Sequence, residues 1–306
     1  MRRLLVPVLL LSACQPPPPA PEGLNESSRF MIREFYADDA TFQAGLQGYL
    51  AWFKDEGAEL IELDNTVDNV GEFQLESLQP EDVEGLPLNH GHDVDVAAGV
   101  VSLAVMNCPI RESEALLMRA DQDTLFEDWE GYERAYVTSR DAYSNGWDSG
   151  FDAIATGQDP FADGFDGAPF ASTLMQTDNI VDPSPVPLVG DFEPYPMHLD
   201  FRHGTFDIDG EATEIFTILT FITDSATNPA GTNSLNQSYS VEVNATWDNG
   251  TTLRTLAVWI EGRADGLDVD PDDPLILNSA LNKSKKASQR MTDICEGTFE
   301  IDDEPS

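Results

Sequence analysis

Apolar residues recur at helical spacing near the start of the chain and at strand spacing further on. Residues 24–56 are expected to form two helices, with Asp38-Asp39 between them as the N-cap of the second. One apolar stripe follows this second helix at positions i, i+4, i+7 and i+11: Phe42, Leu46, Tyr49 and Phe53. Gly57 is expected to end the helix. A stripe of this kind usually packs into a core.

From residue 96 onward, short apolar runs and alternating patterns predict strands. Val96–Met106 is rich in valine and alanine and is expected to be a buried, central strand. Residues 112–123 have helical character, whereas 129–140 are ambiguous, although Tyr132, Arg134, Tyr136 and Thr138 alternate as in a strand. The other segments expected to be strands are 197–206, 214–223, 237–247 and 251–263. This order of elements predicts an α+β fold with an antiparallel sheet.

Asn249-Gly250 lies between the last two strand segments and is the strongest short hairpin signal. A two-residue loop there places Val241 opposite Val258 and makes one face of the hairpin mostly apolar. The polar face then carries Ser240, Glu242, Asn244 and Thr246. We expect the apolar face to be buried and the other to be partly exposed.

The last helix is the clearest. Pro274 suits a first helical position and Gly297 ends the pattern. The buried stripe is predicted to comprise Leu277, Ala280, Leu281, Ser284, Ala287, Ser288, Met291 and Cys295. Several of these residues are small, so the middle of the helix can approach its partner closely. Lys283, Lys286 and Arg290 fall on the exposed side, where they either balance charge or meet an acidic partner.

Residues 144–196 differ from the remainder in composition. Glycine, proline, aspartate and phenylalanine dominate, as in Asp159–Gly167. Irregular segments of this length are uncommon in a compact domain unless they are functional or mobile. The aromatic residues argue against full disorder, because disordered segments are poor in them. We interpret this stretch as a long insertion packed on the surface.

The first residues have the features of a secretory signal, with a basic start at Arg2-Arg3 and an apolar run over Leu4–Leu11. Leu11-Ser12-Ala13-Cys14 resembles the lipobox of bacterial lipoproteins. The resemblance implies cleavage before Cys14, a diacylglycerol on its thiol and an acylated amine of the palmitate type. Two or more acyl chains hold a protein stably on a membrane. Gln15 in place of Asp favours the outer membrane, and an ordinary secretory signal is the alternative.

The chain therefore divides into four parts. They are a signal peptide (1–13), the lipidated Cys14 with a proline-rich tether (14–23), an N-terminal helical segment (24–95) and an α+β domain (96–306) that carries the insertion. The run of four prolines in the tether forms an extended, semi-rigid spacer.

The chain is strongly acidic, with 56 acidic and 16 basic residues and a net charge of −40. Nucleic acid is therefore excluded as a partner, because phosphate binding needs a basic surface. An acid-rich, lysine-poor surface is typical of proteins adapted to saline media. Divalent-cation binding is the sharper alternative.

Cys108 and Cys295 remain after lipidation of Cys14. An even pair of cysteines in an oxidising compartment indicates a disulfide. The bond would tie the end of a buried strand to the end of the last helix.

The order of elements from Val96 to Gly297 resembles the START-like (polyketide cyclase-like) superfamily. In that order a strand and helices precede antiparallel strands and one long final helix. The resemblance implies a helix-grip fold, in which a curved sheet wraps the last helix and encloses an apolar cavity. No specific motif accompanies it, and the insertion at 144–196 departs from the compact pattern.

Candidate chemistry is sparse. His90-Gly91-His92-Asp93 and the pair His198 and Asp200 contain metal-ligand types, but zinc needs three or four converging ligands. Asp268–Asp272 begins like a calcium loop and then lacks the glycine and the bidentate glutamate, and Thr205–Gly210 is similarly incomplete. Nucleophile elbows, P-loops and zinc-protease motifs are missing. No catalytic, cofactor-binding or metal residue is therefore assigned.

These observations favour a non-catalytic envelope lipoprotein that binds an apolar or amphipathic small molecule between sheet and helix. The apolar hairpin face and the small residues of the last helix are expected to line the cavity. Two alternatives stay open. One is a structural or protein-interaction lipoprotein without a pocket, whose contact surface is 144–196 and whose partner the sequence does not name. The other is a metal-dependent hydrolase that uses the histidines.

Overall fold

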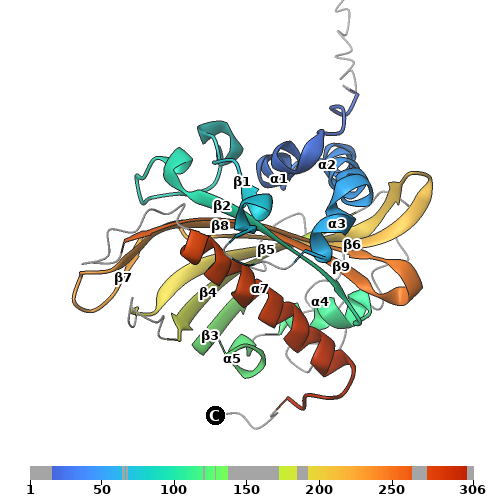
Figure 1. The fold of residues 1–306 in the computed structure, drawn as a ribbon. Coiled ribbons are helices and arrows are strands. Elements are labelled where there is room, and N and C mark those ends of the chain that lie inside the picture. The colour runs from blue at the N-terminus through green and yellow to red at the C-terminus, as the bar shows by residue number, and fades with distance from the viewer. Residues whose placement is uncertain are drawn as a thin grey trace, which may run out of the picture.

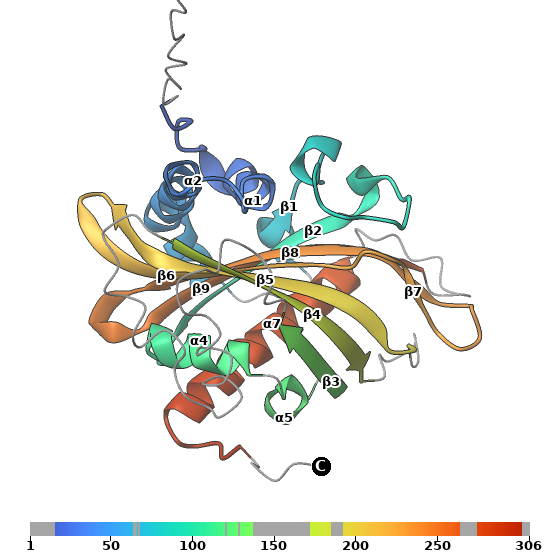
Figure 2. The same cartoon turned by 180° about the vertical axis from the view of Figure 1, so that it is seen from behind.

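The computed structural model describes residues 16–63, 66, 68–119, 121–127, 129–136, 172–184, 192–263 and 274–301. An antiparallel sheet forms the middle layer. The N-terminal helices cover one face, which we call the outer face (Figure 1). The long C-terminal helix α7 (Pro274–Cys295) covers the opposite, inner face together with α4 (Ile110–Met118) and α5 (Gln122–Leu125) (Figure 2).

The N-terminal layer begins with α1 (Gly23–Arg33) and α2 (Asp39–Trp52), which confirms the two predicted helices. Asp38 caps α2 by accepting hydrogen bonds from the amides of Ala40 and Thr41, at 3.0 and 3.1 Å. All four residues of the predicted stripe are buried.

Gly57 does not end this helix. The chain continues through a π-helical turn (Phe53–Gly57) into α3 (Ala58–Ile61). A Cβ at Gly57 would lie 2.7 Å from the ring of Phe53. Gly57 therefore allows close packing. The prediction that it ends the helix was wrong, because its backbone has the right-handed helical conformation and a helix-ending glycine has the left-handed one.

The sheet has nine strands in the order β1-β2-β9-β8-β6-β5-β4-β3, with β7 paired to β8, and all its pairs are antiparallel. The strands are β1 (Gln74–Leu75), β2 (Ala98–Met106), β3 (Trp129–Tyr136), β4 (Ser172–Pro183), β5 (Tyr195–Ile208), β6 (Glu211–Phe221), β7 (Ala226–Thr227), β8 (Ser234–Thr246) and β9 (Thr252–Arg263). Helix η2 (Val70–Phe73) precedes β1, and η3 (Pro80–Asp82), η4 (Val94–Val96), α4 (Ile110–Met118) and α5 (Gln122–Leu125) lie between later strands.

Strand β2 lies near one edge of the sheet, not at its centre. Its outer neighbour β1 contributes two residues only. The apolar sequence of β2 arises because the N-terminal layer and α7 cover its two faces. A continuous apolar run thus reports burial of both faces, and it does not report position in the strand order.

The β8–β9 hairpin differs from the predicted register by one residue. Its loop comprises three residues, Asp248–Gly250, and Trp247 donates its amide to the carbonyl of Thr251 at 2.8 Å. Asn249 and Gly250 both adopt positive φ, at 58° and 79°. Val241 therefore lies opposite Ala257 and not opposite Val258. A shift of one residue changes which side chains share a face.

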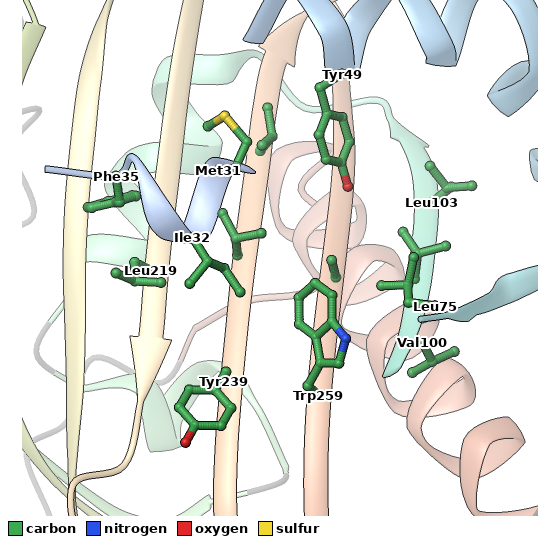
Figure 3. Packing of buried hydrophobic residues seen from close by; sticks show 14 of the residues in the cluster. Met31, Ile32, Phe35, Tyr49, Leu75, Val100, Leu103, Leu219, Tyr239 and Trp259 are labelled. Atoms are coloured by element: carbon green, nitrogen blue, oxygen red, sulfur yellow. The ribbon is translucent and has the colours of Figure 1, made fainter. Parts of the chain in front are cut away.

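The corrected register places seven buried apolar residues of the two strands on the outer face. They are Tyr239, Val241, Val243, Ala245, Leu253, Ala257 and Trp259, and all are buried. Figure 3 shows Met31 and Ile32 of α1 and Tyr49 of α2 over this face, close to Tyr239 and Trp259. The largest hydrophobic cluster of the described residues thus joins the N-terminal helices to the sheet.

Arg202 of β5 joins the sheet to the N-terminal helices through polar contacts. Its guanidinium donates to the carbonyls of Phe35 and Ala37 at 2.7 and 2.9 Å and pairs with Asp39 at 3.0 Å. It also lies 3.9 Å from the ring centroid of Phe42. Satisfying several donors at once makes burial of the arginine tolerable.

Helix α7 (Pro274–Cys295) crosses the inner face, as the sequence predicts. Leu277, Leu281 and Met291 of its stripe are buried. Cys108, just after β2, is bonded to Cys295, the last residue of α7, with Cα atoms 5.3 Å apart. The predicted disulfide is thus confirmed. The antiparallel sheet and the C-terminal helix that crosses it confirm the predicted α+β, helix-grip arrangement.

Part of the predicted insertion belongs to the sheet. Residues 172–183 form β4, which pairs with both β3 and β5. This strand was not predicted, because the composition was judged over the whole of 144–196, where glycine and proline are frequent. The lipobox with Cys14, residues 144–171 of the insertion and the acidic stretch 268–272 lie outside the described residues. Within the described part, no helix is long and apolar enough to cross a membrane.

Candidate functional site

A cavity of about 340 Å³ lies between the inner face of the sheet and α7. Its apolar walls come from Val100, Leu117, Phe126, Trp129, Tyr132, Met197, Leu199, Ile218, Leu256, Val258, Ala280, Leu281 and Ala287. Its polar lining comprises Ser102, Gln122, Thr220, Ser240, Glu242, Arg254, Lys283 and Ser284. Volume and composition both fall within the range of small-molecule sites, which are mostly apolar with a few placed polar groups.

The small residues of α7 help to create this space. Ala280, Ser284 and Ala287 face the sheet where larger side chains would fill the gap. On the opposite side, Phe126 and Trp129 are only half-buried although they are large and apolar. Their partly open environment differs from that of the closely packed outer-face core.

The cavity is lined by a different face of the hairpin from the one the sequence suggested. The apolar face packs against α1 and α2, and none of its residues lines the cavity. It was therefore wrong to expect this face at the cavity. The face that carries Ser240 and Glu242 lines it, with Leu256 and Val258 supplied by the corrected register. The small-residue stripe of α7 was placed correctly.

The floor of the cavity contains a buried ion pair. Arg254 of β9 donates from Nε and Nη2 to the two carboxylate oxygens of Glu242 on β8, at 2.9 and 2.7 Å. The two side chains are 6 and 7% exposed. Nη1 donates to Ser288 Oγ at 2.8 Å and to the carbonyl of Ser284 at 3.3 Å. The pair is therefore bidentate, neutral as a unit and joined to α7.

Aromatic residues of β3 and of the segment after α5 line one side of the cavity. Tyr132 donates to Asn179 Oδ1 at 2.9 Å and accepts from Arg134 at 2.8 Å. Burial raises the pKa of Tyr132, so its hydroxyl stays protonated at neutral pH. Arg290 of α7 pairs with Glu127, the residue after the wall residue Phe126, at 2.8 Å.

The histidines do not assemble into one site. His90 Nδ1 accepts the amide of His92 at 3.1 Å, which leaves Nε2 as the donor to the hydroxyl of Tyr239 at 2.8 Å. Burial, with His92 as a second cause, lowers the pKa of His90 and favours this neutral form. His198 pairs instead with Asp178 at 2.9 Å, on a different part of the sheet.

His203 has a buried partner that sequence patterns did not reveal. It contacts Glu114 of α4, and both side chains are almost fully buried. Burial, and then the charge of Arg111, holds the pKa of His203 well below its usual range. The one available signal was a glutamate four positions from both Ile110 and Met118, on the apolar side of a short helix, which is too common to single out.

The candidate calcium turn has a simpler explanation. In Thr205–Gly210, Asp207 accepts the amide of Gly210 at 2.7 Å within the β5–β6 turn, and Asp209 pairs with Lys54 of the π-helical turn at 2.8 Å. In the described part of the chain, one group of three metal-ligand types occurs, and it consists of Cys108, Cys295 and Glu112. Disulfide sulfurs do not ligate as thiolates, so this group does not make a metal site.

No family model matches the chain, and no curated protein matches it. The solved structures that it resembles include a START superfamily protein from Mycobacterium smegmatis, at 10% identity and a TM-score of 0.32. Another is Ara h 8.0201, at 10% identity and a TM-score of 0.28. Each covers 66% of this chain and 99% of its own. At these scores the similarity says nothing about function, and the fold assignment rests on the strand order and α7.

Proposed function

We propose that this protein binds an apolar or amphipathic small molecule in the cavity between the sheet and α7, without transforming it. The observation that carries the proposal is the cavity itself. Its walls are mainly apolar, and the charges of Glu242 and Arg254 on its floor neutralise each other. The cavity opens to solvent, and its volume of about 340 Å³ falls within the size range of small-molecule sites.

The apolar walls favour an organic ligand over water. Most of the lining residues are apolar, so a ligand gains free energy by burying its own apolar surface against them. The hydroxyls of Ser102, Thr220 and Ser240 can orient one polar end of a ligand.

An obstructed cavity should lose its ligand. We expect the full-length protein, purified in mild detergent, to carry one copy of a small molecule that native mass spectrometry and a solvent extract both detect. Ala287→Phe should reduce the occupancy at least fivefold, because Ala287 lines the cavity and the larger ring takes up part of its space. Lys286→Phe, at an exposed position of the same helix, is the matched control.

Thermal unfolding of both variants separates obstruction from misfolding. A ligand-free wild-type protein that also fails to take up hydrophobic dyes would count against the binding function. That result would favour the structural or protein-interaction role.

We further propose that the mature protein is anchored to the bacterial envelope, outside the cytoplasm, by lipids on Cys14. The proposal rests on the lipobox at residues 11–14 and on the proline-rich spacer after it. We expect the wild-type protein to partition into the detergent phase of a Triton X-114 separation and Cys14→Ala to move to the aqueous phase. Equal partitioning of the two proteins would contradict the anchor.

A further inference from the structure

One row of side chains crosses the inner face of the sheet beneath α7. The strand pairs place five residues side by side in the order Val100, Val258, Ser240, Thr220 and Leu199. All five line the cavity. The row is therefore apolar at both ends, and two neighbouring hydroxyl groups lie in its middle.

These two hydroxyl groups are not used by the fold. Three buried threonines elsewhere in the sheet, Thr177, Thr217 and Thr252, donate theirs to backbone carbonyls at 2.7–3.0 Å. In the described part of the chain, by contrast, neither Ser240 nor Thr220 makes a side-chain hydrogen bond, although both are half-buried. Residues directly opposite each other in an antiparallel pair have Cβ atoms about 4.5–5.5 Å apart. One ligand atom above the pair therefore reaches both hydroxyls.

The charged residues of the described lining already have partners. Glu242 and Arg254 neutralise each other through two hydrogen bonds, and Lys283 also has a partner. The described lining thus offers hydrogen bonds to a ligand without offering it an unpaired charge. Burying an unpaired ion costs far more than burying an uncharged polar group. These residues therefore favour a ligand whose polar group is uncharged.

We infer that the ligand carries an uncharged oxygen, in an alcohol or a ketone, and that this oxygen lies between Ser240 and Thr220. This inference rests on the proposed function, and it adds the class of ligand. A ketone oxygen accepts from both hydroxyls, whereas an alcohol accepts from one and donates to the other. The apolar part of the ligand lies against Val100, Val258 and Leu199 at the two ends of the row.

Four ligands built on one ring system test this inference on the full-length protein. 2-Naphthol and 2-acetylnaphthalene carry the uncharged oxygen, 2-methylnaphthalene lacks it, and 2-naphthoate replaces it with an anion near neutral pH. We expect the better of the two oxygen ligands to bind about fivefold more tightly than 2-methylnaphthalene, an effect typical of one net hydrogen bond. It should exceed 2-naphthoate by at least the same factor, because the anion finds no unpaired cation in the described lining.

Titration calorimetry measures the four affinities in one detergent buffer. The Ala287→Phe variant, whose cavity is obstructed, gives the uptake of each compound by detergent. A resident ligand weakens all four compounds by the same factor, so the ratios of their affinities are the readout.

Two substitutions of similar shape remove the hydroxyl pair. In the double variant Ser240→Ala with Thr220→Val, the preference for the oxygen ligands should vanish, and 2-methylnaphthalene should bind within twofold of its wild-type affinity. Each single substitution should reduce the preference in the same direction. The single variants keep the test available if the double variant does not fold.

Two other serines serve as controls. Ser238 is half-buried and lies two positions before Ser240 on the same face of β8, but it is not part of the described cavity lining. Ser102 lines the cavity two strands away from Ser240, at a distance of about 10 Å or more. Ser238→Ala and Ser102→Ala should therefore both retain the preference.

The possible failures are distinguishable. If 2-methylnaphthalene binds as tightly as both oxygen ligands, or if 2-naphthoate binds most tightly, the assigned class of ligand is wrong and the cavity still binds an apolar molecule. If the double variant keeps the preference, or if Ser102→Ala loses it, the oxygen does not lie between Ser240 and Thr220. If none of the four ligands binds the wild-type protein, the proposed function fails with it.

Discussion

Arg254→Met should destabilise the protein by about 3–5 kcal/mol, the typical cost of removing one partner from a buried ion pair. The substitution leaves the carboxylate of Glu242 on the cavity floor without its bidentate partner. It also removes the hydrogen bonds from Nη1 to Ser284 and Ser288 of α7. Both effects act where α7 meets the sheet. Chemical denaturation of the variant, followed by circular dichroism, measures the change.

The cause of this loss can be tested with two further variants. Arg263→Met removes an exposed arginine from the end of the same strand and should change stability by no more than about 0.5 kcal/mol. The double variant Arg254→Met with Glu242→Leu should recover much of the lost stability, because apolar replacements of buried ion pairs are often neutral or stabilising.

A loss below about 1 kcal/mol for Arg254→Met would mean that water reaches the pair and that the floor is not desolvated. The same result would weaken the proposed function, because an apolar ligand needs a dry floor. Stability and ligand binding are therefore linked through one pair of residues.

The sequence predicted the elements whose signals are local. The second helix and α7 were found because apolar stripes, an aspartate cap and an N-terminal proline act within a few residues of each other. The order of strands and helices also predicted the helix-grip arrangement, since the last helix has a stripe long enough to cross a sheet.

The register of the β8–β9 hairpin was missed for an equally local reason. Asn-Gly is typical of two-residue loops, but here Asp248 joins the loop and moves every pair by one position. As a result, the apolar face of the hairpin was expected at the cavity, whereas the face that carries Ser240 and Glu242 lines it. The apolar face packs on an N-terminal layer whose position is not encoded near the hairpin.

The cavity floor could not be predicted from pairwise patterns. Glu242 and Arg254 belong to strand positions that alternate with buried apolar residues, which indicates a solvent-facing side. They are buried because α7, which begins 20 positions after Arg254, covers them. The small residues Ser284 and Ser288 of the helix were visible in the sequence, but the arginine that they accommodate was not.

Removal of the disulfide is the second change with a large expected effect. Cys108→Ser with Cys295→Ser should lower the free energy of unfolding by about 2–5 kcal/mol. The two cysteines are 187 positions apart, so the bond restricts a long segment of the unfolded chain. A reducing agent should destabilise the wild-type protein by a similar amount and leave the double variant unchanged. Equal sensitivity of the two proteins would show that the reagent acts elsewhere.

The bond also fixes one end of the helix that closes the cavity, and this local role can be separated from the effect on the unfolded chain. Toward its C-terminus α7 is held by Met291 and by the disulfide at Cys295, whereas Leu277 and Leu281 are buried near its start. Hydrogen exchange in the double variant should therefore accelerate over residues 289–295 and change little over residues 277–281. Uniform acceleration along α7 would indicate that the bond acts only through the unfolded state. Because Arg254 contacts the helix at Ser284 and Ser288, between these two ends, protection should decline from that contact toward Cys295.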